Sequence, residues 1–282
     1  MNLKSKGSKK KQVYLIAKYM FLSLMAMICL FPLYFAISSS FKTTAEIMAS
    51  RLAFPTSFTT DNYVRAWSVG NMGRYFLNTI VLTGAAMAIC AVVGLLAAYV
   101  LSRFKFKLQG VIFTFFIAGL MIPMQSTIIP LAYNFGRFGL KNNYPALCLL
   151  FVAFQIPITV FILNAFMKSI PSELEEAAVM DGCSAIRTCF AIIAPVSAPA
   201  LVTASIFNLI NIWNNLLFPL IFITDKNMQT MAFGLLSFFS EWQSDYGGVM
   251  AAISLAIIPP LVIYVLLQEK VEQGITAGAV KG

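Results

Sequence analysis

Charge and histidine are both scarce in this sequence. None of the 282 residues is a histidine, and only 11% are charged, whereas charged residues make up about 25% of an ordinary soluble domain. The charges are also clustered. The charge-free windows between them each exceed the roughly 20 residues that a helix needs to cross a bilayer, and they span residues 19–41, 75–102, 108–136, 142–167, 188–224 and 246–268. The composition therefore predicts an integral membrane protein.

The same absences narrow the possible functions. Because no window contains an ionisable residue and histidine is missing, a proton relay has almost nothing from which it could be built. An ion-coupled secondary transporter or channel stays as the alternative function, since the carbonyl groups of broken helices can coordinate sodium. The sequence has no HExxH or GxSxG pattern, which argues against an intramembrane enzyme, and no GxxxxGKS/T phosphate loop. The energy source must therefore be a partner.

The cysteines predict neither a metal site nor a disulfide. The five cysteines have no metal-ligand spacing and form no extracellular pair. We interpret them as small apolar residues of the spans and of one loop. We accordingly expect no metal, no cofactor and no catalytic residue.

The windows predict an all-α, polytopic fold with six transmembrane helices. Periodicity cannot distinguish a buried strand from a helix in such runs, so their length decides in favour of helices. The fifth window is long enough for two spans, but four asparagines interrupt it, and we assign it one. The expected organisation is a basic tail (1–18), a six-span domain (19–268) and a C-terminal tail (269–282), with spans near 19–38, 76–101, 110–133, 145–166, 191–212 and 247–268 and a loop at 168–190.

The net charge of +9 follows from this topology rather than from a nucleic-acid partner. Thirteen of the 20 Lys and Arg residues fall on the side of the N-terminal tail, and seven fall on the other side. Because basic loops stay in the cytoplasm, we expect both termini there. The Lys-rich tail is then placed to contact membrane lipid.

The loop at 168–190 carries four of the eleven acidic residues and predicts a short helix. Ser172 is placed to cap its first turn, and Glu175, three residues later, completes the pattern of a capping box. The helix is expected to end near Asp181. Gly182 then stands where a left-handed residue is wanted after a helix, so the chain should turn sharply there. We expect an acidic helix that lies parallel to the membrane surface.

This loop resembles a known family. Glu176-Ala177-Ala178, Gly182, Ile192 and Pro195 match the spacing E-A-A-x3-G-x9-I-x-L-P, which is the EAA loop of ABC importer permeases, with Ala194 in place of the usual Leu. The resemblance implies a coupling helix that lies in a cleft of the ATPase and passes its motion to the pore. The residues expected to couple to the ATPase are Ser172, Leu174, Glu176, Ala177, Ala178, Asp181 and Gly182.

Other segments resemble the carbohydrate-type permeases of this family. Trp213-Asn214-Asn215 with Pro219 is similar to W-N-E/D-x3-P-L, although Asn215 replaces the usual acid. Further similar segments are Asn62-Tyr63, Asn78-Thr79, Tyr246-Gly247, Met250-Ala251-Ala252, Pro259-Pro260 and the stretch 274–282. The resemblance implies import of a di- or oligosaccharide across a bacterial cytoplasmic membrane. The implied partners are ABC ATPase subunits, a second related permease in a heterodimer, and an extracytoplasmic solute-binding protein.

A sugar path needs uncharged polar groups that hydrogen-bond hydroxyls within an apolar wall. Each candidate could instead join two helices, a role worth about 1 kcal/mol. The candidates are Asn78, Gln125, Ser126, Gln155, Asn208, Asn211 and Trp213.

Overall fold

The computed structural model describes residues 4–241 and 245–279, and within those ranges the regular structure is helical, with no strand. The all-α prediction is confirmed. Val280, Lys281 and Gly282, which belong to the C-terminal tail and to the segment 274–282, lie outside the described residues, as does the start of the basic tail at 1–3.

The chain divides into two compact units, which are described separately. The first contains Met1–Gly70 and Phe238–Leu255, and the second contains Asn71–Ser237 and Ala256–Gly282. The elements of the first unit are α1 (Lys4–Ser40), α2 (Thr44–Ala49), α3 (Asp61–Val64), a π-helical segment (Arg65–Val69) and the first residues of α14 (Tyr246–Ala279). Along α1, large apolar side chains from Val13 to Phe31 are exposed, as expected of a helix that meets lipid or another membrane helix.

The loop after α1 is held together by Glu46. Thr43 and Glu46 form a capping box at the start of α2. The Glu46 carboxylate also accepts hydrogen bonds from the Ser57 amide at 3.0 Å and from the hydroxyls of Thr56 and Ser57. The hydrogen bond from the Ser57 hydroxyl, followed by those from Thr56 and Thr43, lowers the pKa of Glu46 to about 2. The carboxylate is therefore ionised at neutral pH, the form that accepts these hydrogen bonds.

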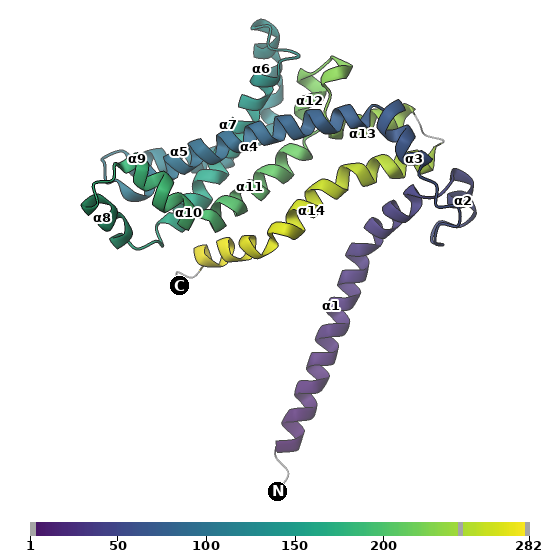
Figure 1. Ribbon diagram of the computed structural model, residues 1–282, viewed down its shortest axis with the longest axis horizontal. Coiled ribbons are helices and arrows are strands. Elements are labelled where there is room, and N and C mark those ends of the chain that lie inside the picture. Colours follow the sequence, from purple (N-terminus) through teal and green to yellow (C-terminus); the bar gives the residue numbers. More distant parts are fainter. Residues whose placement is uncertain (1–3, 242–244, 280–282) are drawn as a thin grey trace. The chain divides into compact units, whose positions relative to one another are not determined.

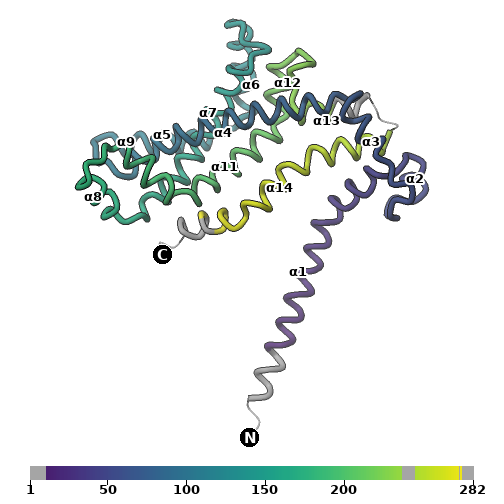
Figure 2. Tube along the Cα trace, viewed as in Figure 1, coloured from purple at the N-terminus to yellow at the C-terminus, as the bar shows by residue number. Residues whose placement is uncertain are grey.

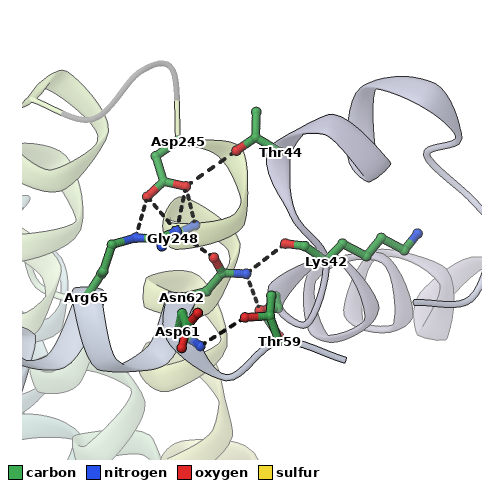
Figure 3. A network of polar contacts seen from close by, with 9 residues as sticks. Lys42, Thr44, Thr59, Asp61, Asn62, Arg65, Asp245 and Gly248 are labelled. Atoms are coloured by element: carbon green, nitrogen blue, oxygen red, sulfur yellow. Dashed lines mark hydrogen bonds and ion pairs between the residues drawn. The ribbon is translucent and has the colours of Figure 1, made fainter. Parts of the chain in front are cut away.

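A polar network joins this loop to the start of α14 (Figure 3). The Arg65 guanidinium donates two hydrogen bonds to the Asp245 carboxylate, at 3.1 and 3.2 Å. Asp245 also accepts from the Gly248 amide at 3.1 Å and so caps α14. Asn62 accepts from Arg65 at 2.7 Å and donates to the Lys42 carbonyl at 2.8 Å. Asn62, one of the residues that carry the family resemblance, therefore has a structural role in this unit.

The second unit is built around α7, which packs against α4, α5 and α11; α4 also packs against α11 (Figures 1 and 2). Its elements are α4 (Met72–Arg103), α5 (Gln109–Leu120), α6 (Met124–Arg137), α7 (Tyr144–Met167), α8 (Glu173–Met180), α9 (Ala185–Thr188), a π-helical segment (Cys189–Ile193), α10 (Ala194–Val196), α11 (Ala198–Trp213), α12 (Leu217–Phe222), a 3-10 turn (Lys226–Met228), most of α13 (Met231–Glu241) and the remainder of α14.

Helix α7 contributes to both apolar cores of this unit. Toward one end, Phe151 packs against Phe218 of α12, with ring centroids 5.6 Å apart. Toward the other end, the buried side chains of Leu163 and Met167 pack with Ile193. The two cores together hold α4, α7 and α11 against one another.

Among the described residues, four helices are long and apolar enough to span a membrane, and the number rises to six if each of two bent pairs forms one span. The pair α5 and α6 is bent by 94°, and the pair Ala185–Val196 with Ala198–Trp213 is bent by 79°. These pairs occupy the positions of the predicted third and fifth spans. Proline accounts for both bends. Pro123 has extended backbone before α6, and Pro199 has no amide hydrogen with which to continue the helix across Ser197.

Helices α4 and α7 approach so closely at Gly94 that we expect its substitution by alanine to destabilise the protein. A methyl group there would lie 2.5 Å from Cγ2 of Thr159 on α7, which demands a shift of the Thr159 side chain or of one helix. The cost of overpacking is about 1–3 kcal/mol, which exceeds the gain of about 1 kcal/mol from replacing glycine in a helix. The measurement is the midpoint of thermal unfolding in detergent.

Gly84, on the same helix, supplies the matched control. A methyl group at Gly84 would meet no atom within 4 Å, so Gly84→Ala keeps the helix-forming gain without the clash. We expect it to unfold at or above the temperature of the unmodified protein. Equal midpoints for Gly94→Ala and Gly84→Ala would show that the contact with Thr159 is not tight.

Candidate functional site

A cavity of about 680 Å³ lies in the second unit, between the break that separates α5 from α6, the middle of α7 and the end of α11. Its lining contains no charged residue and combines an apolar wall with five side-chain amides. The wall includes Leu120, Ile122, Met124, Phe154, Ile158, Phe207 and Ile210, and the amides belong to Gln125, Gln155, Asn211, Asn214 and Asn215.

The amides come from α6, α7, α11 and the segment that follows α11. Gln155, on α7, is buried, and its side-chain oxygen accepts a hydrogen bond of 3.3 Å from Nδ2 of Asn211 on α11. Gln125 and Asn214 are exposed. Asn215 accepts from the Phe218 amide at 3.0 Å, while its Nδ2 lies 3.1 Å from the sulfur of Met124. The cavity therefore offers amide donors and acceptors, set in an apolar wall, to an uncharged polar ligand.

Three of the seven predicted path residues, Gln125, Gln155 and Asn211, thus share one cavity. Asn214 and Asn215 are two lining residues that the prediction missed. They stand three and four positions after Asn211, directly after the end of α11. That spacing was the available signal, but the prediction used both residues as interruptions of an apolar run and in the resemblance to W-N-E/D-x3-P-L, not as path residues.

The other four predicted path residues do not line the cavity. Asn208 is buried and donates to the Thr159 hydroxyl at 3.0 Å, so it joins α11 to α7. Trp213 donates to the Ala256 carbonyl at 3.0 Å. Their partners are consistent with the alternative interpretation, in which polar groups join neighbouring segments.

Asn78 and Ser126, the other two of these four residues, hydrogen-bond to backbone carbonyls. Nδ2 of Asn78 donates to the carbonyls of Asn227 and Gln229, both at 2.9 Å, and so ties the turn around residue 228 to α4. The Ser126 hydroxyl donates to the Pro123 carbonyl at 2.7 Å, within its own helix start.

A second candidate region is the loop that contains α8. A helix forms at Glu173–Met180, within the residues 172–181 of the predicted helix, but the predicted capping box is wrong. Ser172 has helical backbone angles and its side chain makes no capping hydrogen bond. The Glu175 carboxylate does not return to the helix start, because it forms an ion pair with Arg103 of α4, with Nε and Oε1 2.7 Å apart. A guanidinium is a stronger partner for a carboxylate than a neutral amide.

The end of α8 matches the prediction. Gly182 has a φ of +75°, in the left-handed region that glycine favours. Its amide donates to the Val179 carbonyl at 3.0 Å, and the Cys183 amide donates to the Ala178 carbonyl at 2.9 Å. This pair of bonds is a Schellman motif, and it turns the chain sharply toward α9.

The exposed face of α8 differs in part from the prediction. Leu174, Glu176, Ala177 and Asp181 are exposed as expected, but Ala178 is buried and turns toward the rest of the unit. The most exposed large apolar side chains of this loop are those of Val179, Met180 and Ile186, which are 65%, 86% and 69% exposed. The prediction missed them, although apolar residues in an otherwise acidic loop are a signal for a covered surface.

Comparison with known proteins identifies the family. The family model described as the binding-protein-dependent transport system inner membrane component matches residues 90–277. The diacetylchitobiose uptake system permease protein NgcG of Streptomyces coelicolor is 34% identical over 91% of this chain and 86% of its own length. The trehalose/maltose transport system permease protein MalG of Thermococcus litoralis is 34% identical over 92% of this chain and 94% of its own.

Among solved structures, a bacterial ABC transporter involved in the import of the acidic polysaccharide alginate contains a similar chain. The TM-score is 0.78 at 21% identity, with 92% of this chain and 97% of that chain covered. At this identity the likeness supports the fold alone. The family match and the relatives together show that this multi-pass membrane protein belongs to the inner-membrane components of binding-protein-dependent transport systems.

Proposed function

We propose that this chain is the permease subunit of an ATP-driven importer that carries a di- or oligosaccharide across the bacterial cytoplasmic membrane. The relatives named for transport of diacetylchitobiose and of trehalose and maltose support the substrate class. The excess of Lys and Arg on one side of the spans supports an orientation with both termini in the cytoplasm.

The observation that carries the proposal is the uncharged cavity with its five amides. Sugar hydroxyls both donate and accept hydrogen bonds, and side-chain amides do the same. The apolar side chains around them exclude ions, because an ion would lose its hydration without gaining a compensating charge. The same composition argues against ion-coupled transport, since no ionisable side chain lines the cavity.

Energy and capture would come from partners. In the proposed assembly, α8 docks on an ABC ATPase subunit through Leu174, Glu176, Ala177 and the exposed Val179 and Met180. A second, related permease completes the pore, and an extracytoplasmic solute-binding protein delivers the sugar. Purification from native membranes tests this assembly. The chain isolated alone, and still transporting solute without ATP, would contradict it.

We expect Gln155→Leu combined with Asn211→Leu to reduce uptake without loss of assembly. Leucine is of similar size but removes the hydrogen bonds, each worth about 1 kcal/mol, so uptake should fall about tenfold or change its sugar preference. The measurement is ATP-dependent uptake of maltose, trehalose, diacetylchitobiose and raffinose by proteoliposomes that contain the purified complex and its binding protein.

Asn208→Leu is the matched control, one turn away on α11. It removes the bond to Thr159 rather than a group that lines the cavity. Its expected effect is a lower unfolding temperature with unchanged uptake for each assembled complex. Wild-type uptake and wild-type sugar preference in the Gln155→Leu and Asn211→Leu double variant would remove the cavity from the substrate path.

A further inference from the structure

Arg103 joins three segments of the second unit with one guanidinium. It belongs to the last turn of α4. Its Nε lies 2.7 Å from Oε1 of Glu175 on α8, and its Nη2 donates to the Ile170 carbonyl at 3.0 Å. The side chains of Arg103 and Glu175 are only 11% and 18% exposed. The contact is therefore a largely buried ion pair between the end of α4 and the loop helix.

The surroundings of this pair are apolar. The adjacent core contains Tyr99 of α4, Met167 at the end of α7, Ile170 beyond α7, and Cys189. Burying two charges in such a place costs much of what their attraction returns, so a pair of this kind is weak evidence for stability. Nε of Arg103 and Oε1 of Glu175 are buried and find no hydrogen-bond partner within the described residues, so the attraction between the two charges is what holds α8 to α4. Fixing the position of two elements is a role that such pairs can fill.

Helix α8 has few other side chains that attach it to the unit. Glu173, Leu174, Glu176, Ala177, Val179 and Met180 are all exposed. Glu175 and Ala178, three positions apart on one helix face, are the two that turn inward. Ala178 supplies a small apolar contact without direction. Within the described residues, the carboxylate of Glu175 is thus the polar side chain that ties α8 to another helix.

Helix α4 also contacts the helices that line the cavity. Helix α4 packs along α7 and α11, and it meets Thr159 of α7 at Gly94 with no room for a methyl group. Both α7 and α11 line the cavity. A displacement of α4 would therefore reach the cavity walls through direct contacts.

We propose that the Arg103–Glu175 ion pair is the link through which a displacement of α8 moves α4, and that both are positioning residues for transport. The proposal rests on the proposed function, in which α8 contacts an ATPase subunit. Glu175 then serves a different purpose from its exposed neighbour Glu176. The former faces inward to Arg103, and the latter faces outward to the partner.

The test is charge reversal in the complete complex. Arg103→Glu and Glu175→Arg are made singly and together, and the number of sugar molecules taken up for each ATP hydrolysed is measured in proteoliposomes. In each single variant we expect this ratio to fall about tenfold, while the ATPase subunits still co-purify. The double variant, which restores the pair with reversed polarity, should recover most of the ratio. Glu173→Arg reverses an exposed acid of the same helix and should leave it unchanged.

Two results would overturn the link. One is a wild-type ratio in both single variants, and the other is a double variant no better than the worse single variant. If charge reversal prevents assembly, Arg103→Lys and Glu175→Gln replace it, and a wild-type ratio in both would again overturn the link. A wild-type complex without ATP-dependent uptake would instead contradict the proposed function, so the two failures are distinguishable.

Discussion

Replacing Glu176 by lysine is expected to reduce uptake on the order of a hundredfold while the chain still inserts into the membrane. Glu176 is exposed and makes no hydrogen bond or ion pair with the described residues of its own chain. Its place in the first half of α8 gives it a macrodipole benefit of about 0.3–1 kcal/mol at most. Loss of a charged contact across an interface costs about 2–5 kcal/mol, so only a partner contact accounts for a severe effect.

Glu173→Lys distinguishes a loss of helix stability from the loss of a contact with the partner. Glu173 is also exposed and stands closer to the start of α8, where the macrodipole favours a carboxylate more strongly. If helix stability were the cause, Glu173→Lys would be the worse variant. The measurements are co-purification of the ATPase, binding-protein-stimulated ATP hydrolysis and uptake. Wild-type values of all three for Glu176→Lys would leave α8 as an ordinary surface helix.

Gly182→Val is expected to uncouple transport by changing the direction of the chain after α8. A methyl group at Gly182 would meet no atom within 4 Å, so the substitution causes no clash. Its effect comes from the φ of +75°, which a branched side chain tolerates poorly. The expected strain is about 1–2 kcal/mol or more, and relieving it would open the Schellman motif that sets the angle between α8 and α9.

Gly139 is the matched control, because it also has a left-handed backbone conformation but lies outside the loop that contains α8. Its φ is +64°, and a methyl group there would also meet no atom within 4 Å. Gly139→Val should therefore carry a similar strain after α6, far along the chain from α8. We expect both variants to unfold at slightly lower temperature, and only Gly182→Val to lose binding-protein-stimulated ATP hydrolysis and uptake. Equal uptake in the two variants would show that the turn after α8 does not affect coupling.

The features that could be predicted from the sequence are those set by interactions between residues close together in the chain. The position of α8 and the left-handed Gly182 follow from residues within one or two helical turns, and both were predicted. The capping box failed because the partner of Glu175 is Arg103, 72 residues earlier in the chain, and no local pattern shows such a contact. Apolar windows likewise gave the helices but not the 94° and 79° bends, although the prolines that cause the bends were visible.

Some predicted path residues line the cavity and others join two helices, and again the difference depends on contacts between distant parts of the chain. Asn208 and Asn211 stand on the same helix, three positions apart, and both are amides in an apolar run. One meets Thr159 in a buried contact, and the other lines the cavity. The choice depends on where α7 crosses α11, which composition and spacing along a single segment cannot specify.

The close crossing of α4 and α7 has a mechanical consequence. Helices that leave no room for a methyl group at Gly94 cannot slide past one another without separating, since packed interiors have low compressibility. The α4–α7 pair is therefore stiff. A shape change of this unit is then expected where its helices are interrupted, as they are at Pro123 and Ser197. The compliant points of the unit are thus two breaks, the first of which, between α5 and α6, borders the cavity.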